Sequence, residues 1–178
     1  NDPSSEPGLP TNYPSVINMG FDVPQTCVVG GLAIDFAISS ERPDDLDILV
    51  VDPQGRKSLV ISDAGGNSPL TWTGYLFGFF SPVFPDEFAP PVGYYSGANY
   101  AGLPALEPDG IDNFPNAGGA AQYPMNFAPF IAGGFINFGP WKLYVVDDET
   151  GNLSSLPQGW RVSVRWFCSQ PGGCVPTP

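Results

Sequence analysis

The chain has 178 residues, of which only 13% are charged, and its six Lys and Arg residues against 18 Asp and Glu give a formal net charge of −12. So few basic residues cannot build the positive surface that a nucleic-acid-binding protein needs. The chain contains no histidine, which excludes the Ser-His-Asp and Cys-His arrangements of nucleophilic hydrolases.

Glycine and proline are frequent, with 22 of each. Such a content approaches that of disordered chains. Here it is accompanied by 13 Phe, 7 Tyr and 4 Trp residues, a combination that favours a loop-rich all-β domain over disorder. No apolar run approaches the ~20 residues that a membrane-spanning helix requires, and we expect no membrane insertion.

The N-terminal segment, residues 1–26, contains five prolines and almost no periodicity, which predicts an extended arm with one short strand at residues 15–19. The next segment, "GLAIDFAIS" (31–39), alternates apolar residues on one face with small or polar residues on the other. Strict alternation of this kind is typical of a half-buried strand. Two further strands, "LDILVV" and "SLVI", flank the turn Asp52-Pro53-Gln54-Gly55 and predict a β-hairpin.

Residues 64–140 contain no Lys or Arg and many Gly, Pro and aromatic residues, which predicts short strands joined by long loops. Alternation returns in "WKLYVVDD" (141–148) and in "GWRVSVRWF" (159–167). Gly and Pro interrupt every window long enough for a helix. We therefore predict one all-β domain, a β-sandwich or jelly roll over residues 27–168, with an arm at 1–26 and a tail at 169–178.

Two motifs carry a resemblance to a known family. "ERPDDLDILVVDPQGRKSLVISDAGG" (41–66) and "GPWKLYVVDDETGNLSSLPQGWRVSVRW" (139–166) resemble the signature regions of the P domain of proprotein convertases and bacterial subtilases. The segment "YPSVINMGF" is similar to a short N-terminal strand of bacterial cell-surface relatives. The resemblance implies a jelly-roll sandwich whose first long strand neighbours its last. It also implies either an accessory module that stabilises a subtilisin-type protease or an extracellular domain without a protease.

Six aspartates fall at strand ends within these two motifs. They are Asp44, Asp45, Asp47, Asp63, Asp147 and Asp148. Calcium takes six to eight oxygen ligands from carboxylates and turn carbonyls, and few basic residues are present to neutralise these acids. The pattern therefore predicts calcium as a cofactor. The alternative is that the aspartates accept backbone N–H bonds at turns.

The three cysteines, Cys27, Cys168 and Cys174, lack the spacing of a metal site and indicate an oxidising compartment. If the first long strand and the last run antiparallel, a Cys27–Cys168 disulfide would close nearly the whole domain; Cys168–Cys174 is the alternative. The side-chain alternation points Cys27 and Cys168 to opposite faces. The first pairing therefore requires a β-bulge at Gly30-Gly31 that reverses the faces.

Other candidate sites lie in the loop-rich middle. Tyr94, Tyr95 and Tyr100 are candidate aromatics for stacking on sugar rings or for filling an interface. The acids Asp86, Glu87, Asp109 and Asp112 are the remaining candidates for a glycosidase pair, and their simpler interpretation is solvated loop carboxylates.

Taken together, the sequence predicts a secreted protein, without catalytic activity, that assembles with copies of itself into an extracellular filament or surface layer. The first residue, Asn1, suggests a processed product. Strand addition at an exposed sheet edge is a general way to join such subunits. The alternatives are the accessory domain of a secreted subtilase and an adhesion module that binds surface polysaccharide.

Overall fold

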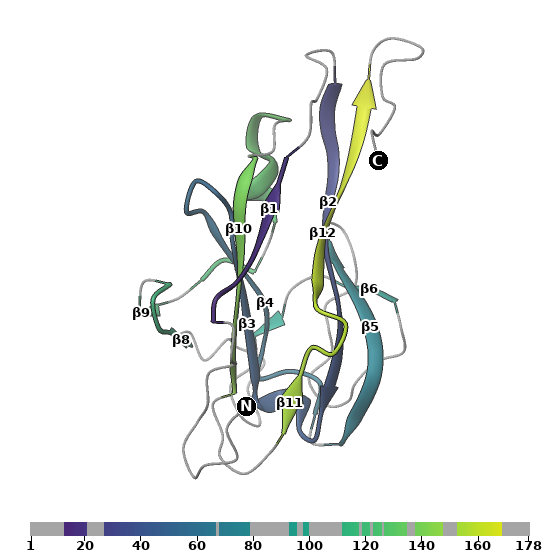
Figure 1. Cartoon of the computed structure of the whole chain (residues 1–178), viewed down its shortest axis with the longest axis vertical. Helices are drawn as coiled ribbons and strands as arrows, with labels where there is room; N and C mark the ends of the chain where they lie inside the picture. The colour runs from purple at the N-terminus through teal and green to yellow at the C-terminus, as the bar shows by residue number, and fades with distance from the viewer. Residues whose placement is uncertain are drawn as a thin grey trace.

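The chain forms two β-sheets that lie face to face, as the computed structural model in Figure 1 shows. The structure describes residues 13–20, 27–66, 68–78, 93–95, 98–99, 112–117, 119–121, 123–125, 127–134, 138–147 and 153–168. The predicted all-β sandwich is confirmed. Within these ranges the helical segments are two 3₁₀ helices, η1 (Pro43–Asp45) and η2 (Ala128–Gly134), and neither is long enough to cross a membrane.

The first sheet, sheet A, contains both the predicted N-terminal strand and the predicted hairpin. Its strands in spatial order are β1 (Ser15–Met19), β10 (Gly139–Asp147), β3 (Leu46–Val51), β4 (Lys57–Ser62) and β7 (Ala98–Asn99). All neighbours are antiparallel except β4 and β7.

The second sheet, sheet B, is built around the 14-residue strand β2 (Cys27–Ser40). One side of β2 pairs with β5 (Leu70–Gly78), which is followed by β6 (Gly93–Tyr95). The other side pairs with β12 (Trp160–Cys168) and β11 (Ser154–Ser155). The first long strand therefore lies beside the last, as the family resemblance implied.

The core lies between the two sheets and follows the alternation of the sequence. Ile34 and Ile38 of β2, Ile48 of β3 and Trp141 of β10 are fully buried there. Burying an aliphatic side chain of this size contributes roughly 1.5–3 kcal/mol. The ring of Trp141 meets that of Phe130 edge to face at 5.2 Å, which brings η2 into the same core.

Sheet A is covered on its outer face as well, which explains why every residue of β3 is buried. Leu49, Leu59 and Tyr144 form a second apolar cluster on that face with Phe114. Phe114 belongs to a hairpin of β8 (Asp112–Phe114) and β9 (Gly119–Ala121), which lies outside sheet A in Figure 1. Part of the aromatic-rich middle of the chain thus forms a third layer.

The turn of the β3–β4 hairpin is stabilised by a buried carboxylate. Asp52 accepts hydrogen bonds from the backbone N–H groups of Gln54 and Arg56, at 2.9 and 2.8 Å, and its Oδ2 pairs with the Arg56 guanidinium at 2.6 Å. Gly55 adopts a φ of 79° within this turn, a conformation that glycine tolerates without strain. Arg56 also donates to the carbonyl of Phe130, which ties the turn to η2.

Candidate interaction surfaces

Among the described residues, β2 and β12 continue beyond the rest of sheet B as a two-stranded ribbon. The described pairing of β5 with β2 begins at Ala33, whereas β12 remains paired with β2 as far as Cys27. In Figure 1 the two strands extend past the upper ends of β1 and β10. We call residues 27–31 and 165–168 the ribbon tip.

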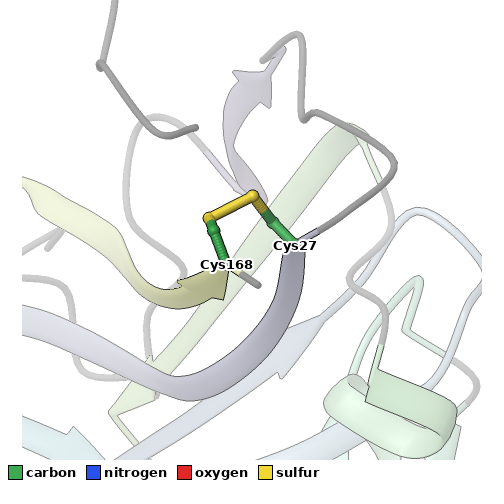
Figure 2. The surroundings of a disulfide bond; sticks show 2 residues. All are labelled: Cys27 and Cys168. Carbon is green, nitrogen blue, oxygen red and sulfur yellow. A yellow bond between two sulfur atoms is a disulfide. The ribbon is translucent and has the colours of Figure 1, made fainter. Parts of the chain in front are cut away.

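The ribbon tip is closed by a disulfide between Cys27 and Cys168, which lie directly opposite each other in the strand register. Figure 2 shows the bridge joining the first residue of β2 to the last residue of β12. The Cα atoms are 4.1 Å apart, and 141 residues separate the two cysteines in the sequence. The preferred cysteine pairing is confirmed.

A β-bulge makes this pairing possible. Arg165 pairs with Gly31, and the next residue, Trp166, pairs with Val29, so that the register passes over Gly30. One extra residue on one strand reverses the faces of the residues beyond it. Cys27 therefore points to the same side as Cys168, and the bulge predicted at Gly30-Gly31 is confirmed.

The same bulge places an apolar pair on the outer face of the ribbon tip. Val28 and Phe167 are partners in the strand register, and they are 48% and 55% exposed. The guanidinium carbon of Arg165 lies 5.5 Å from the centre of the Phe167 ring, a distance at which a cation is attracted to an aromatic face. The ribbon tip thus presents an exposed apolar pair, and the guanidinium group of Arg165 lies against the aromatic ring of that pair.

Those predicted calcium ligands that the structure describes lie at the opposite end of the sandwich, where η1 leads into β3, where β4 ends and where β10 ends. Asp45, Asp47 and Asp147 are buried there. The Arg42 guanidinium approaches the carboxylates of Asp44 and Asp45, at 3.8 and 3.5 Å, and offsets part of their negative charge.

Two of these acids, Asp47 and Asp147, lie on opposite faces of sheet A. Asp47 pairs with Val146, which packs on the outer cluster, whereas Asp147 pairs with Leu46, a residue of the inner core. Because directly opposite residues share a face, Asp47 and Asp147 point to opposite sides of the sheet. Within the described ranges no group of three or more acidic, Cys or His side chains could hold a metal ion. Calcium binding stays a prediction.

Asp63 occupies a turn of unusual backbone geometry. Its φ is 48°, and Gly65 and Gly66 follow with φ of 104° and 71°. Asp tolerates this left-handed region better than most residues because its short side chain bonds locally. Its Oδ2 accepts a hydrogen bond from Ser62 at 3.2 Å. These positive φ angles explain why the segment "SDAGG" forms a turn and why Asp and Gly occupy these positions.

Beside the acidic end, Glu41 and Leu153 form a second exposed pair. The Glu41 carboxylate accepts the Leu153 N–H at 3.2 Å, and the Glu41 N–H donates to the Leu153 carbonyl at 3.1 Å. The hydroxyls of Ser40 and Ser154, 2.8 Å apart and buried, hold β11 against β2 at the adjoining position. Leu153 is 54% exposed. The sequence offered no signal for this pair, because 112 residues separate its members.

The two sheets also present edges on the same side of the sandwich. Among the described strands, β12 pairs only with β2 and β1 pairs only with β10. The indole N–H of Trp160 donates to the Ser15 hydroxyl at 3.0 Å and links these two edges. On the outer face of β12, Arg161 forms an ion pair with Asp35 of β2. A charged residue on an edge strand hinders uncontrolled pairing with other chains.

A tyrosine cluster lies against the outer face of sheet A. The rings of Tyr13 and Tyr144 meet edge to face at 5.3 Å. Burial, together with the neighbouring phenols of Tyr144 and Tyr123, raises the pKa of Tyr13 well above its usual value, and burial raises the pKa of Tyr144. These phenols therefore stay protonated at neutral pH and contribute to the packing of the outer cluster.

Several predicted site residues fall beyond what the structure describes. Tyr94 and Tyr95 belong to β6, but only their backbone is described, and Asp112 is the first residue of β8, again described only by its backbone. Outside the described residues altogether are Asp148, Tyr100, Cys174, Asp86, Glu87 and Asp109.

No family model, no curated protein and no solved structure matches this chain. The two exposed pairs and the strand edges are therefore the features from which a function can be inferred.

Proposed function

We propose that this chain is a secreted structural subunit, without catalytic activity, that assembles with copies of itself. The observation that carries the proposal is the exposed pair Val28–Phe167 at the ribbon tip. An apolar pair could be buried by a small shift of the chain, but here two constraints keep it outside. The disulfide fixes the end of the ribbon, and the bulge at Gly30 fixes which face each side chain occupies.

An apolar surface held in place in this way supports a role in association. The composition agrees, because a chain without histidine lacks the usual catalytic base. The described edges of β1 and β12 supply backbone groups to which a neighbouring strand can add. The disulfide fits an oxidising compartment such as the extracellular space.

Sedimentation velocity over a range of concentrations tests this proposal. We expect the weight-average mass of the unmodified protein to rise with concentration beyond that of a monomer. The variant Val28→Ser/Phe167→Ser should stay monomeric at the same concentrations, because both exposed side chains become polar. A wild-type protein that stays monomeric at every concentration contradicts the proposal.

The second candidate is an accessory domain of a subtilase. It is favoured by the adjacency of β2 and β12, which the family resemblance implies. Such a domain would be monomeric and would raise the melting temperature of a protease joined to it.

A further inference from the structure

The two exposed pairs lie at opposite ends of one strand. Phe167, with Arg165 against its ring, sits beside the first residues of β2. Leu153, hydrogen-bonded to Glu41, sits beside its last residues. At ~3.3 Å per residue, the 14 residues of β2 separate the two pairs by roughly 43 Å. The ribbon tip and the Glu41–Leu153 patch therefore cannot meet within one copy.

The pairs match each other in chemistry. Each pair contains an exposed apolar side chain, Phe167 in one and Leu153 in the other. Phe167 lies beside the cation Arg165, whereas Leu153 lies beside the anion Glu41, so the two pairs carry opposite charges. Such an arrangement buries apolar area and also fixes orientation through the charges. Arg165 is one of only six Lys and Arg residues in a chain of net charge −12, so few side chains of this molecule can pair with a carboxylate of another copy.

Charge also argues against contact between two identical patches. A symmetric dimer through the ribbon tips would bring Arg165 of one copy toward Arg165 of the other, and like charges at an interface are unfavourable. A contact between unlike patches pairs Arg165 with Glu41. Because these patches lie at opposite ends of the molecule, repetition of that contact gives an open chain of subunits.

We propose that the ribbon tip of one copy docks on the Glu41–Leu153 patch of the next, with Phe167 and Val28 against Leu153 and with Arg165 facing Glu41. This contact rests on the proposed self-assembly and names its interface. Repetition of this contact gives a head-to-tail filament in which successive subunits are stacked in the direction of β2.

Charge reversal tests the contact. The variant Arg165→Glu changes the net charge from −12 to −14, and Glu41→Lys changes it from −12 to −10. Each variant alone places like charges across every junction, and we expect its critical concentration for assembly to rise at least about tenfold, which corresponds to ~1.4 kcal/mol per junction. Lys142→Glu, on β10, makes the same change in charge as Arg165→Glu at a position outside both patches and should assemble like the wild type.

Two combinations should restore assembly. The double variant Arg165→Glu/Glu41→Lys exchanges the two charges, so that a carboxylate on the ribbon tip faces an ammonium group on the patch of the next copy. An equal mixture of the two single variants should form an alternating chain in which every junction pairs opposite charges. The carboxylate introduced at position 165 faces the ammonium group introduced at position 41 at one junction, and Arg165 faces Glu41 at the next. Light scattering measures all of these, and the melting temperature of each variant shows that it is folded.

The outcomes separate this inference from the proposed function. Loss of assembly in both single variants, with recovery in the double variant, supports the head-to-tail contact. Wild-type assembly that neither single variant changes overturns the contact and leaves self-assembly standing. Weaker assembly of Arg165→Glu, without any effect of Glu41→Lys and without recovery in the double variant, places the ribbon tip but not the Glu41–Leu153 patch in the interface and also overturns the contact. A wild type that never assembles removes the proposed function and the contact together.

Discussion

The ring of Phe167 occupies the space in which a side chain at Gly30 would lie. A Cβ built on Gly30 would come within 2.0 Å of Phe167 Cε2 and 2.2 Å of its Cδ2. The glycine at the bulge therefore has a steric role, since it allows the aromatic ring to cover the backbone of the neighbouring strand. This contact links the bulge that aligns the cysteines to the apolar pair exposed at the ribbon tip.

Replacing Gly30 by Ala should destabilise the ribbon tip. The ring of Phe167 would have to swing away or the strands would have to separate, and we expect a loss of about 1 kcal/mol in the free energy of unfolding, within the roughly 1–3 kcal/mol typical of overpacking. Gly31→Ala is the matched control, because the nearest atom to its Cβ would be Arg165 Cβ at an ordinary 3.7 Å. Denaturant unfolding of both variants measures the difference. Equal stability of the two would contradict the steric role of Gly30.

Removal of the disulfide should lower stability considerably more. The bridge closes a loop of 141 residues, and the loop-entropy relation gives about 5 kcal/mol for such a loop. We expect Cys27→Ser/Cys168→Ser to show a much lower melting temperature than the wild type, whereas Cys174→Ser should retain the bridge. Mass spectrometry of unreduced peptides identifies the pairing. A Cys168–Cys174 peptide in the wild type would contradict the structure.

Tyr13 should limit stability at alkaline pH. Its pKa is raised in the folded state above the ordinary value of 10.0, so the phenol ionises first in the unfolded chain. The free energy of unfolding is then unaffected by this group below about pH 10 and falls as the pH rises from there toward the folded-state pKa. Tyr13→Phe removes this contribution, and the loss of stability between about pH 8 and pH 11 should be smaller than in the wild type.

The same variant has an expected effect at neutral pH. The Tyr13 hydroxyl is buried and has no hydrogen-bond partner among the residues that the structure describes, and leaving such a group unsatisfied costs about 1–3 kcal/mol. Tyr13→Phe should therefore be neutral or stabilising at neutral pH. Tyr144→Phe is the comparison, because its hydroxyl donates to the Asn116 carbonyl at 3.4 Å. Urea unfolding that shows Tyr13→Phe to be the less stable of the two variants would count against this account.

The strands whose apolar residues alternate could be located from the sequence. β2, β10 and β12 follow from period-two patterns, and the β3–β4 hairpin follows from the residues of its turn. The short strand β1 was predicted in a segment that has almost no periodicity. The alternation of side chains along the two strands also predicted the bulge at Gly30-Gly31. Cys27 and Cys168 would otherwise point to opposite faces and could not form a disulfide. Alternation is a local property, and it is available wherever one face of a strand is buried and the other is not.

The third layer could not be predicted in the same way. β3 is buried on both faces, so its sequence carries no sign of what covers the outer one. The residues that do so, Phe114 and Tyr123 among them, belong to a region without periodicity. The pairing of Glu41 with Leu153 escaped prediction because it depends on the position of β11 against β2.

The acidic turns show the limit of motif reasoning. The aspartates were expected at strand ends, and several do lie at one end of sheet A. Their directions depend on register, which separates Asp47 from Asp147, and on Arg42, which approaches Asp44 and Asp45. Neither relationship is visible in the spacing of the acids.

The calcium prediction has a direct test. If calcium braces these turns, a chelator should lower the melting temperature, and calcium but not magnesium should restore it, since magnesium demands a stricter octahedral geometry. Asp45→Asn/Asp47→Asn should remove the response to calcium. A melting temperature that is the same in chelator and in calcium would contradict the prediction.

Electron microscopy of the negatively stained, unmodified protein, over a series of concentrations, tests self-assembly most directly. The account predicts filaments one subunit wide or bundles of them, with a regular repeat along their length. In the Val28→Ser/Phe167→Ser variant the filaments should be absent. Dispersed single particles of the wild type at every concentration would contradict self-assembly, and filaments of the variant that match those of the wild type would contradict the role of the ribbon tip.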